Sequence, residues 1–176
     1  MAGPLDTAAE DWRDQVFAAL KAADIRQVGF VPDAGHARLI ELVEADPAIR
    51  AVSLTTEEEG IALAAGAWLG GQRTALLMQS SGVGNCINML SLTKGARFPF
   101  LCLVSMRGDF GEGNPWQFPM GQAVQPLLEA MDVIVLRADT PADVIPTVSA
   151  ALTMVFQSGQ AVAVLLGQRL IGAKKF

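Results

Sequence analysis

Residues 74–90 read TALLMQSSGVGNCINML, and they carry the clearest signal for the fold of the chain. It opens with an uninterrupted apolar run, continues through a turn rich in glycine and serine, and ends with apolar residues at helical spacing. A short strand that is apolar on both faces and leads through a tight turn into a helix is typical of a parallel sheet covered by helices. We therefore expect a strand at 74–78 and a helix at 84–94.

The same alternation recurs along the chain. Short apolar runs predict strands and longer segments with helical spacing predict helices. The strands are expected at 28–31, 51–54, 74–78, 100–104, 133–136 and 161–166, and the helices at 11–23, 35–44, 57–69, 84–94, 122–130 and 141–156. This order predicts an α/β fold, a doubly wound six-stranded parallel sheet with helices on both faces. We expect residues 1–176 to form a single domain.

The composition excludes several classes of protein. With 176 residues, 51% of them hydrophobic and 18% charged, the chain is long and apolar enough to form a sizeable core. A net charge of −5 argues against a nucleic-acid partner. Two cysteines and one histidine exclude a disulfide framework and a metal site built from these residues. Without a signal peptide or a continuous apolar span, we expect a cytoplasmic protein with no membrane partner.

Polar residues gather where the predicted strands end, which is the edge at which doubly wound sheets bind ligands. The only histidine, the longest run of acids and the turn richest in glycine and serine all lie at this edge. Turns after strands are commonly polar, yet the coincidence predicts a functional site. The four stretches are PDAGH at 32–36, TTEEE at 55–59, QSSGVGN at 79–85 and SMRGD at 105–109. The irregular stretch 107–121, with four glycines and two prolines, is predicted to be a lid or binding loop.

Three consecutive glutamates begin the helix predicted to follow the second strand. A capping box of Thr56 with Glu59, or of Thr55 with Glu58, accounts for two of them, and acids in a first turn also suit the helix dipole. A third adjacent carboxylate adds repulsion that capping does not require. The helix that follows consists almost entirely of small or apolar residues, so its start is expected to be buried. We therefore expect one carboxylate to lie in a site without water and to share a proton with a ligand.

The turn at 79–85 could bind an anion or a polar ligand edge through its backbone amides. It lacks both the dinucleotide fingerprint and the phosphate-loop lysine, so an NAD or ATP phosphate site is disfavoured, and a plain turn is the alternative. His36 could act as a general acid or base, although a lone histidine in a loop is more often a capping or surface residue.

The remaining reactive side chains are weaker candidates. Arg107 ends a predicted strand and is therefore better placed than Lys94 or Arg97 to pair with an anionic substrate. Cys86 on a helix and Cys102 inside a strand are expected to be small buried hydrophobes rather than nucleophiles.

Four motifs in this order resemble the pyrimidine-binding (PYR) domain of thiamine-diphosphate-dependent 2-oxoacid decarboxylases. The sulfopyruvate decarboxylases are the most similar group in that family, and the phosphonopyruvate decarboxylases are the next. The resemblance covers nearly the whole chain and implies the same six-stranded sheet. The motifs are VPDAGH at 31–36, TTEEEGIALAAGAWLGG at 55–71, LLMQSSGVGNCINMLSL at 76–92 and RGDFGEGNPWQFPMG at 107–121.

The resemblance implies a role for most of the edge residues. The family's glutamate lies nine residues before the glycine of the small-residue helix, which places it at Glu57, counted from Gly66. It would hydrogen-bond N1′ of the aminopyrimidine and favour the imino tautomer that activates the cofactor. Pro32, Gln79, Ser80, Ser81 and Gly82 would line the cofactor together with Glu57. Asp33 and His36 would face the substrate, as would Arg107, the candidate named above for pairing with an anion. Glu57 and His36 are the candidates for catalysis.

The family's motif for the diphosphate is missing from this chain. That motif is Gly-Asp-Gly with a later asparagine, whereas here Gly108 and Asp109 precede Phe110 and no asparagine follows Asn114. The resemblance therefore implies that thiamine diphosphate is shared with a β subunit whose PP domain holds the diphosphate and Mg²⁺, in an α2β2 or larger hetero-oligomer. The expected substrate is a small anionic 2-oxoacid, sulfopyruvate, which would yield sulfoacetaldehyde and CO₂. Phosphonopyruvate as substrate, or a non-catalytic binding module, are the alternatives.

Overall fold

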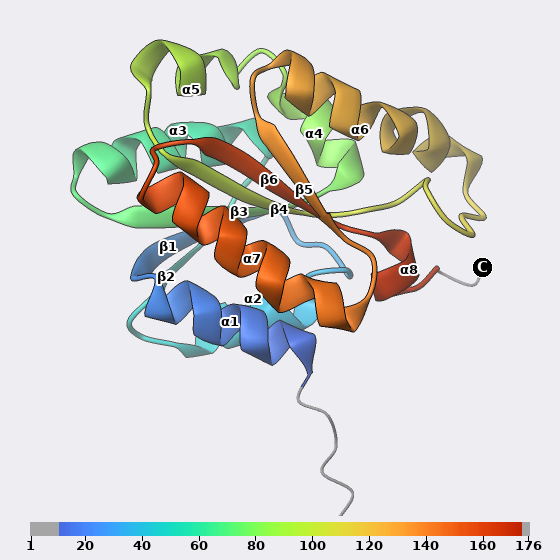
Figure 1. Ribbon diagram of the computed structural model, residues 1–176, viewed down its shortest axis with the longest axis horizontal. Helices are drawn as coiled ribbons and strands as arrows, with labels where there is room; N and C mark the ends of the chain where they lie inside the picture. Colours follow the sequence, from blue (N-terminus) through green and yellow to red (C-terminus); the bar gives the residue numbers. More distant parts are fainter. Residues whose placement is uncertain (1–10, 174–176) are drawn as a thin grey trace, which may run out of the picture.

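The computed structural model describes residues 11–173, which form a six-stranded parallel sheet between two layers of helices (Figure 1). The order across the sheet is β2-β1-β3-β4-β6-β5, and every pair of neighbours is parallel. The predicted doubly wound α/β fold is thus confirmed. The strands are β1 (Ile25–Phe30), β2 (Arg50–Ser53), β3 (Arg73–Gln79), β4 (Phe100–Ser105), β5 (Ile134–Ala138) and β6 (Ala161–Leu166).

Each face of the sheet carries its own apolar core beneath its own helices. The first core lies under α1 (Trp12–Ala22), α2 (Ala37–Ala45) and α7 (Pro141–Phe156). The second lies under α3 (Glu58–Leu69), α4 (Ser80–Cys86) and α6 (Phe118–Ala130), with α5 (Ser91–Ala96) beside α3. Because helices cover both faces, almost every residue of the central strands is buried, and this explains their continuous apolar sequence.

The chain departs from the expected elements at three places. The turn expected at 79–85 is mostly helical, as α4, and the helix expected at 84–94 is interrupted between α4 and α5, because the glycines and asparagines of this stretch are weak helix formers. α6 begins before residue 122 and is preceded by a 3₁₀ turn, η1 (Pro115–Gln117). A short helix, α8 (Gln168–Ile171), follows the last strand, where no helix was expected.

The sheet reverses its winding between β1 and β3. The chain leaves β1 through α2 on one face and leaves β3 through α4 on the other, although the two strands are neighbours. The carboxyl ends of strands at such a switch point border the crevice in which open α/β sheets bind ligands. The topology therefore selects the ends of β1 and β3, rather than the whole edge, as the place to look for a site.

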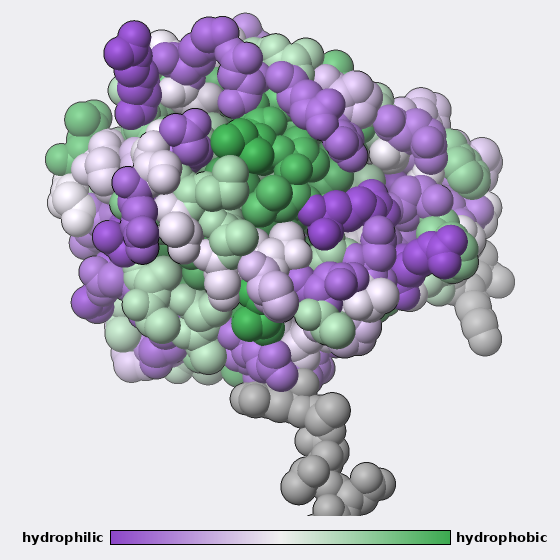
Figure 2. All heavy atoms as spheres, viewed as in Figure 1, coloured by the Kyte–Doolittle hydropathy of each residue, from purple (hydrophilic) through white to green (hydrophobic). Residues whose placement is uncertain are grey.

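Apolar surface is distributed unevenly over the molecule. Figure 2 shows a hydrophobic area above β5, the strand at one edge of the sheet, within a border that is mostly polar.

Among residues 11–173, no helix has the length and apolar character needed to cross a membrane. Among the described residues, the large apolar side chains that are exposed are Trp68, Leu69, Leu92, Phe110, Trp116 and Phe118.

Candidate active site

Glu57 directly precedes α3, and its side chain lies against α4. The residue is 8% exposed. A Cβ atom at Gly82 would stand only 2.4 Å from its Oε1, so only glycine leaves room for the carboxylate there. The other oxygen, Oε2, accepts a hydrogen bond of 2.8 Å from Nδ2 of Asn85. Within residues 11–173, this is the only hydrogen bond to the Glu57 side chain.

The two neighbouring glutamates are exposed, and neither expected capping box forms. Glu57 occupies the N-cap position of α3 without a capping hydrogen bond from its side chain. Oε2 of Glu59 instead accepts the backbone N–H of Thr55 at 2.8 Å. The expected pairs were therefore wrong in detail, because the helix begins one residue later than a cap at Thr56 requires. Glu59 contributes to the start of the helix, while Glu57 is directed toward α4.

Asp33 links the carboxyl ends of three strands. Its Oδ1 accepts a hydrogen bond from Nε2 of Gln79 at 2.9 Å, and its Oδ2 accepts one from the backbone N–H of Gly35 at 3.0 Å and another from the hydroxyl of Ser105. Oε1 of Gln79 in turn accepts from the hydroxyl of Ser81 at 2.8 Å. The structure thus brings Asp33, Gln79 and Ser81 together at the switch point, and both Asp33 oxygens already have donors.

Two of the sequence-predicted site residues lie inside the fold. His36 is 1% exposed, and its Nε2 donates to the carbonyl oxygen of Met78 at 3.2 Å. Burial lowers the pKa of this imidazole, so it is held neutral. Ser80 is also buried, and its hydroxyl accepts the backbone N–H of Arg107 at 3.0 Å. These two side chains connect the ends of strands behind the surface, whereas Pro32 is exposed.

Arg107 is paired with a carboxylate of its own chain. Its Nε and NH2 groups donate to the two oxygens of Glu112 at 2.6 and 2.7 Å. Glu112 also accepts from the backbone N–H of Asn114 at 2.9 Å and from Nε2 of Gln168 at 2.9 Å. The Arg107 guanidinium holds the pKa of the Glu112 carboxyl well below its usual range. The charge of Arg107 is therefore already balanced.

This pairing anchors the stretch that was predicted to be a lid or binding loop. Gly108 has a positive φ of 75°, and a Cβ atom there would lie 2.2 Å from the carbonyl oxygen of Gln117. Nε2 of Gln122 donates to the carbonyl oxygen of Gly108 at 2.8 Å. Gln168 accepts the backbone N–H groups of Asp109 and Phe110 at 3.2 and 3.1 Å. The loop is thus fixed to α6 and α8.

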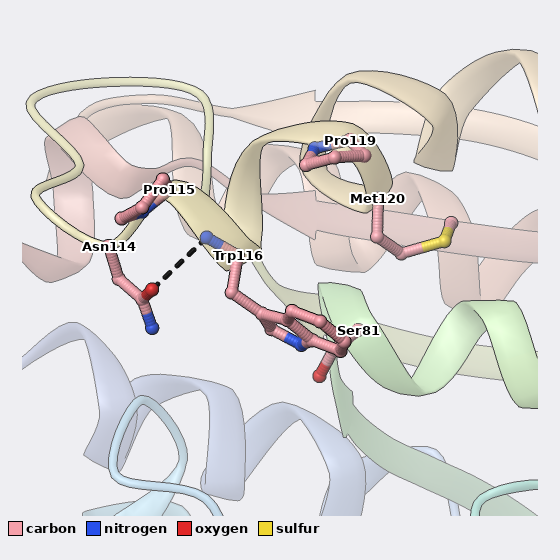
Figure 3. A pocket seen from close by; sticks show the side chains of 6 residues that line it. All are labelled: Ser81, Asn114, Pro115, Trp116, Pro119 and Met120. Atoms are coloured by element: carbon pink, nitrogen blue, oxygen red, sulfur yellow. Dashed lines mark hydrogen bonds between the residues drawn. The ribbon is translucent and has the colours of Figure 1, made fainter.

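The anchored loop borders an open hollow of about 660 Å³ next to α4. The Trp116 ring, 82% exposed, extends from η1 toward Ser81 at the start of α4, and Oδ1 of Asn114 accepts the backbone N–H of Trp116 at 3.1 Å (Figure 3). The sulfur of Met120 would lie 3.0 Å from a Cβ at Gly84. The residues that line the hollow are Ser81, Asn114, Pro115, Trp116, Pro119 and Met120.

The chemistry of the site follows from these contacts. A carboxylate that receives a single neutral hydrogen bond retains acceptor capacity for a donor on a ligand. Gly82 keeps the approach to this carboxylate free of side chains, which suits a flat ring that carries an N–H group. Among residues 11–173, no three His, Cys, Asp or Glu side chains gather in a way that could hold a metal ion.

Four residues that contribute to this edge could not be singled out by the sequence patterns. Asn85 and Trp116 lie within stretches that were singled out, but nothing in their spacing distinguishes them from their neighbours. Glu112 was hidden in a loop whose internal pairing no local pattern reveals. Gln168 could have been found, because it follows the sixth strand directly and the strand-end argument applies there too.

Comparison with known proteins adds relatives in sequence and in structure. No family model matches the chain. The chain is 38% identical over 157 residues to the sulfopyruvate decarboxylase subunit alpha of Methanothermobacter thermautotrophicus, and the match covers 89% of this chain and 95% of that protein. It is 39% identical over 118 residues to a phosphonopyruvate decarboxylase of Streptomyces viridochromogenes, covering 66% of this chain and 30% of that protein.

A solved structure shares the fold. The chain superimposes on 2-oxoglutarate:ferredoxin oxidoreductase from Magnetococcus marinus with a TM-score of 0.74 and 17% sequence identity. The match covers 92% of this chain and 29% of that much longer chain. At this identity the likeness supports the arrangement of strands and helices, and it leaves the chemistry to be argued from the site.

Proposed function

Since this chain belongs to the family of sulfopyruvate decarboxylase α subunits, we propose that it is the α subunit of a thiamine-diphosphate-dependent decarboxylase that converts sulfopyruvate to sulfoacetaldehyde and CO₂. The observation that carries the proposal is the Glu57 carboxylate, which rests against Gly82 and keeps one oxygen without a partner among the described residues. This is the arrangement that an aminopyrimidine ring nitrogen requires.

Bound thiamine diphosphate supplies an electron sink for the pair that remains when CO₂ departs. Glu57 would accept a hydrogen bond from the protonated ring nitrogen of the cofactor and so hold a proton at that atom. Gly82 would let the ring approach the carboxylate closely. Gln79 and Ser81, ordered through Asp33, would present polar groups along the same edge of the sheet.

The interior residues receive different roles from those that the resemblance implied. We infer that His36 and Ser80 keep the strand ends in register rather than contact substrate or cofactor, because both are buried and hydrogen-bonded to the backbone. We infer likewise that Arg107 anchors the loop, since Glu112 already occupies its guanidinium. Groups that bind the sulfonate of the substrate would then come largely from the partner.

A partner chain would complete the site. The relatives that this chain matches along their length are named as α subunits, whereas the Streptomyces phosphonopyruvate decarboxylase is a chain of which only 30% is matched. We propose that a β subunit holds the diphosphate through Mg²⁺ and closes over the hollow beside Trp116, in an α2β2 or larger assembly. The open, mostly apolar lining of that hollow suits a surface that is covered on assembly.

The decisive experiment uses this chain co-purified with its β subunit. We expect aldehyde release from sulfopyruvate with thiamine diphosphate and Mg²⁺, and no release from either subunit alone. Phosphonopyruvate is the second candidate substrate, favoured by the Streptomyces relative, and its kcat/KM measured beside that of sulfopyruvate decides between the two acids. An intact complex that releases no aldehyde from either acid would refute the proposed function.

A further inference from the structure

Helix α4 forms a notch that receives the Glu57 carboxylate. Gly82 supplies the space, because any side chain there would collide with the carboxyl group. Asn85 supplies a donor, with its Nδ2 at 2.8 Å from Oε2. The two residues are three positions apart in α4 and therefore lie on one face of the helix. Space and donor thus act on the same carboxylate from the same side.

The hydrogen bond distinguishes the two oxygens of Glu57. The terminal torsion of a glutamate is broad and nearly two-fold, so an unrestrained carboxylate samples many orientations. Asn85 engages Oε2, and the geometry leaves Oε1 beside Gly82. We propose that Asn85 is a positioning residue that fixes the orientation of the Glu57 carboxylate and thereby reserves Oε1 for the ring nitrogen of the cofactor. This inference rests on the proposed function of the site.

A neutral amide suits this task better than a charged donor. An arginine or lysine would form a charge-assisted pair and compete with the cofactor for the carboxylate. Glu112 illustrates that outcome, because both of its oxygens are occupied by the Arg107 guanidinium. An aspartate at position 85 would repel Glu57 instead. Among residues 11–173, no cationic side chain pairs with Glu57, so its charge stays available.

The first test compares two substitutions of Asn85 in the α–β complex. Asn85→Ala removes the donor, and we expect kcat to fall roughly tenfold, which corresponds to about 1.4 kcal/mol of activation free energy. Asn85→Asp keeps the volume but adds repulsion, and we expect a larger fall. KM for sulfopyruvate should stay within about twofold, because Asn85 acts through Glu57. Asn88→Ala, at an exposed asparagine near α4, is the matched control and should leave kcat unchanged.

The order of the two variants separates positioning from packing. If Asn85 merely filled space, Asp would retain more activity than Ala, and that order, or equal activity in both variants and the wild type, would overturn the inference. Because Asn85 is exposed, we expect all three variants to unfold within about 2 °C of the wild type. Losses in kcat then reflect the site rather than the fold.

The second test detects the contact without any turnover. In the ¹⁵N-labelled isolated chain, the side-chain amide resonances of Asn85, assigned by their loss in Asn85→Ala, should move on Glu57→Gln and stay in place on Glu59→Gln. Unmoved resonances in Glu57→Gln would overturn the inference. Failure of the proposed function is a different result, in which the wild-type complex turns over neither acid while this amide response persists.

Discussion

Two carboxylates at the same edge of the sheet have opposite surroundings. Glu112 has a fully buried side chain and receives hydrogen bonds from Arg107, Gln168 and the backbone of its own loop. Glu57 is almost as buried but accepts a single hydrogen bond from the neutral amide of Asn85. One carboxylate is saturated, and the other keeps free acceptor capacity.

The difference separates a structural carboxylate, Glu112, from the carboxylate that we propose to be functional, Glu57. A buried charge is costly unless hydrogen bonds and an opposite charge satisfy it, and Glu112 meets this requirement within its own chain. Glu57 does not, and we propose that a ligand completes its surroundings. Both carboxylates lie in polar stretches beyond strand ends, and only their hydrogen-bond partners distinguish them.

The largest expected effect lies at the open carboxylate. Glu57→Gln should lower kcat of the α–β complex by roughly 10²–10⁴-fold, because an amide cannot hold the proton of the ring nitrogen. The free energy of unfolding should stay the same or rise, since glutamine has the same shape, its oxygen can still accept from Asn85, and the substitution removes a buried charge. Steady-state kinetics and urea unfolding of the same preparation check both parts. Undiminished turnover would remove Glu57 from the mechanism.

The saturated carboxylate should show the reverse pattern. Glu112→Gln leaves the guanidinium of Arg107 buried without its counter-charge, and breaking such a pair typically costs about 3–5 kcal/mol of unfolding free energy. Glu59→Gln, an exposed neighbour of Glu57, is the control and should cost well under about 1 kcal/mol. A Glu112→Gln variant as stable as the wild type would contradict the assignment of Glu112 as a structural carboxylate.

Lowering the pH should remove the stabilisation that the ionised Glu112 carboxylate provides. Its hydrogen bonds from Arg107 hold the pKa of the carboxyl below the ordinary value of 4.5, so the folded state binds this proton less readily than the unfolded state. The stabilisation is therefore complete well above pH 4.5 and declines as the pH falls from there toward the lower pKa of the folded chain. Unfolding of wild type and Glu112→Gln should accordingly converge as the pH is lowered from 6 to 3.

The sequence was sufficient for the architecture and only partly for the site. Apolar runs and helical spacing predicted all six strands, because burial on both faces of a parallel sheet leaves a strong local pattern. The strand-end rule predicted that Asp33, Gln79 and Ser81 would share an edge, and the structure brings them together. Cys86 and Cys102 are buried as expected, and burial raises the pKa of Cys86 to about 12.

The pairing of side chains could not be predicted in the same way. Arg107 looked available for a substrate because its partner, Glu112, lies in an irregular loop whose path no periodicity describes. His36 was expected to face the substrate, but its ring nitrogen bonds the carbonyl oxygen of Met78 in β3, which is 42 residues away in sequence. Contacts between segments decide such roles, and a single sequence records only the segments.

The smallest expected effect concerns His36 and tests whether this residue is structural, like Glu112, or functional, as we propose for Glu57. Burial lowers the pKa of this imidazole below its ordinary value of 6.5, and the nearby charge of Asp33 opposes the shift only in part. The unfolded chain therefore binds a proton that the folded chain resists, so stability is complete above pH 6.5 and declines as the pH falls below it. His36→Gln, which retains a donor for the carbonyl oxygen of Met78, should lose that decline. Urea unfolding of both proteins between pH 7.5 and 5 measures the difference.

If His36 belongs with the buried structural groups, as we infer, kcat of the complex should not follow the titration of an imidazole near pH 6.5. If kcat followed such a titration in the wild type and not in His36→Gln, His36 would instead belong with Glu57 among the functional residues.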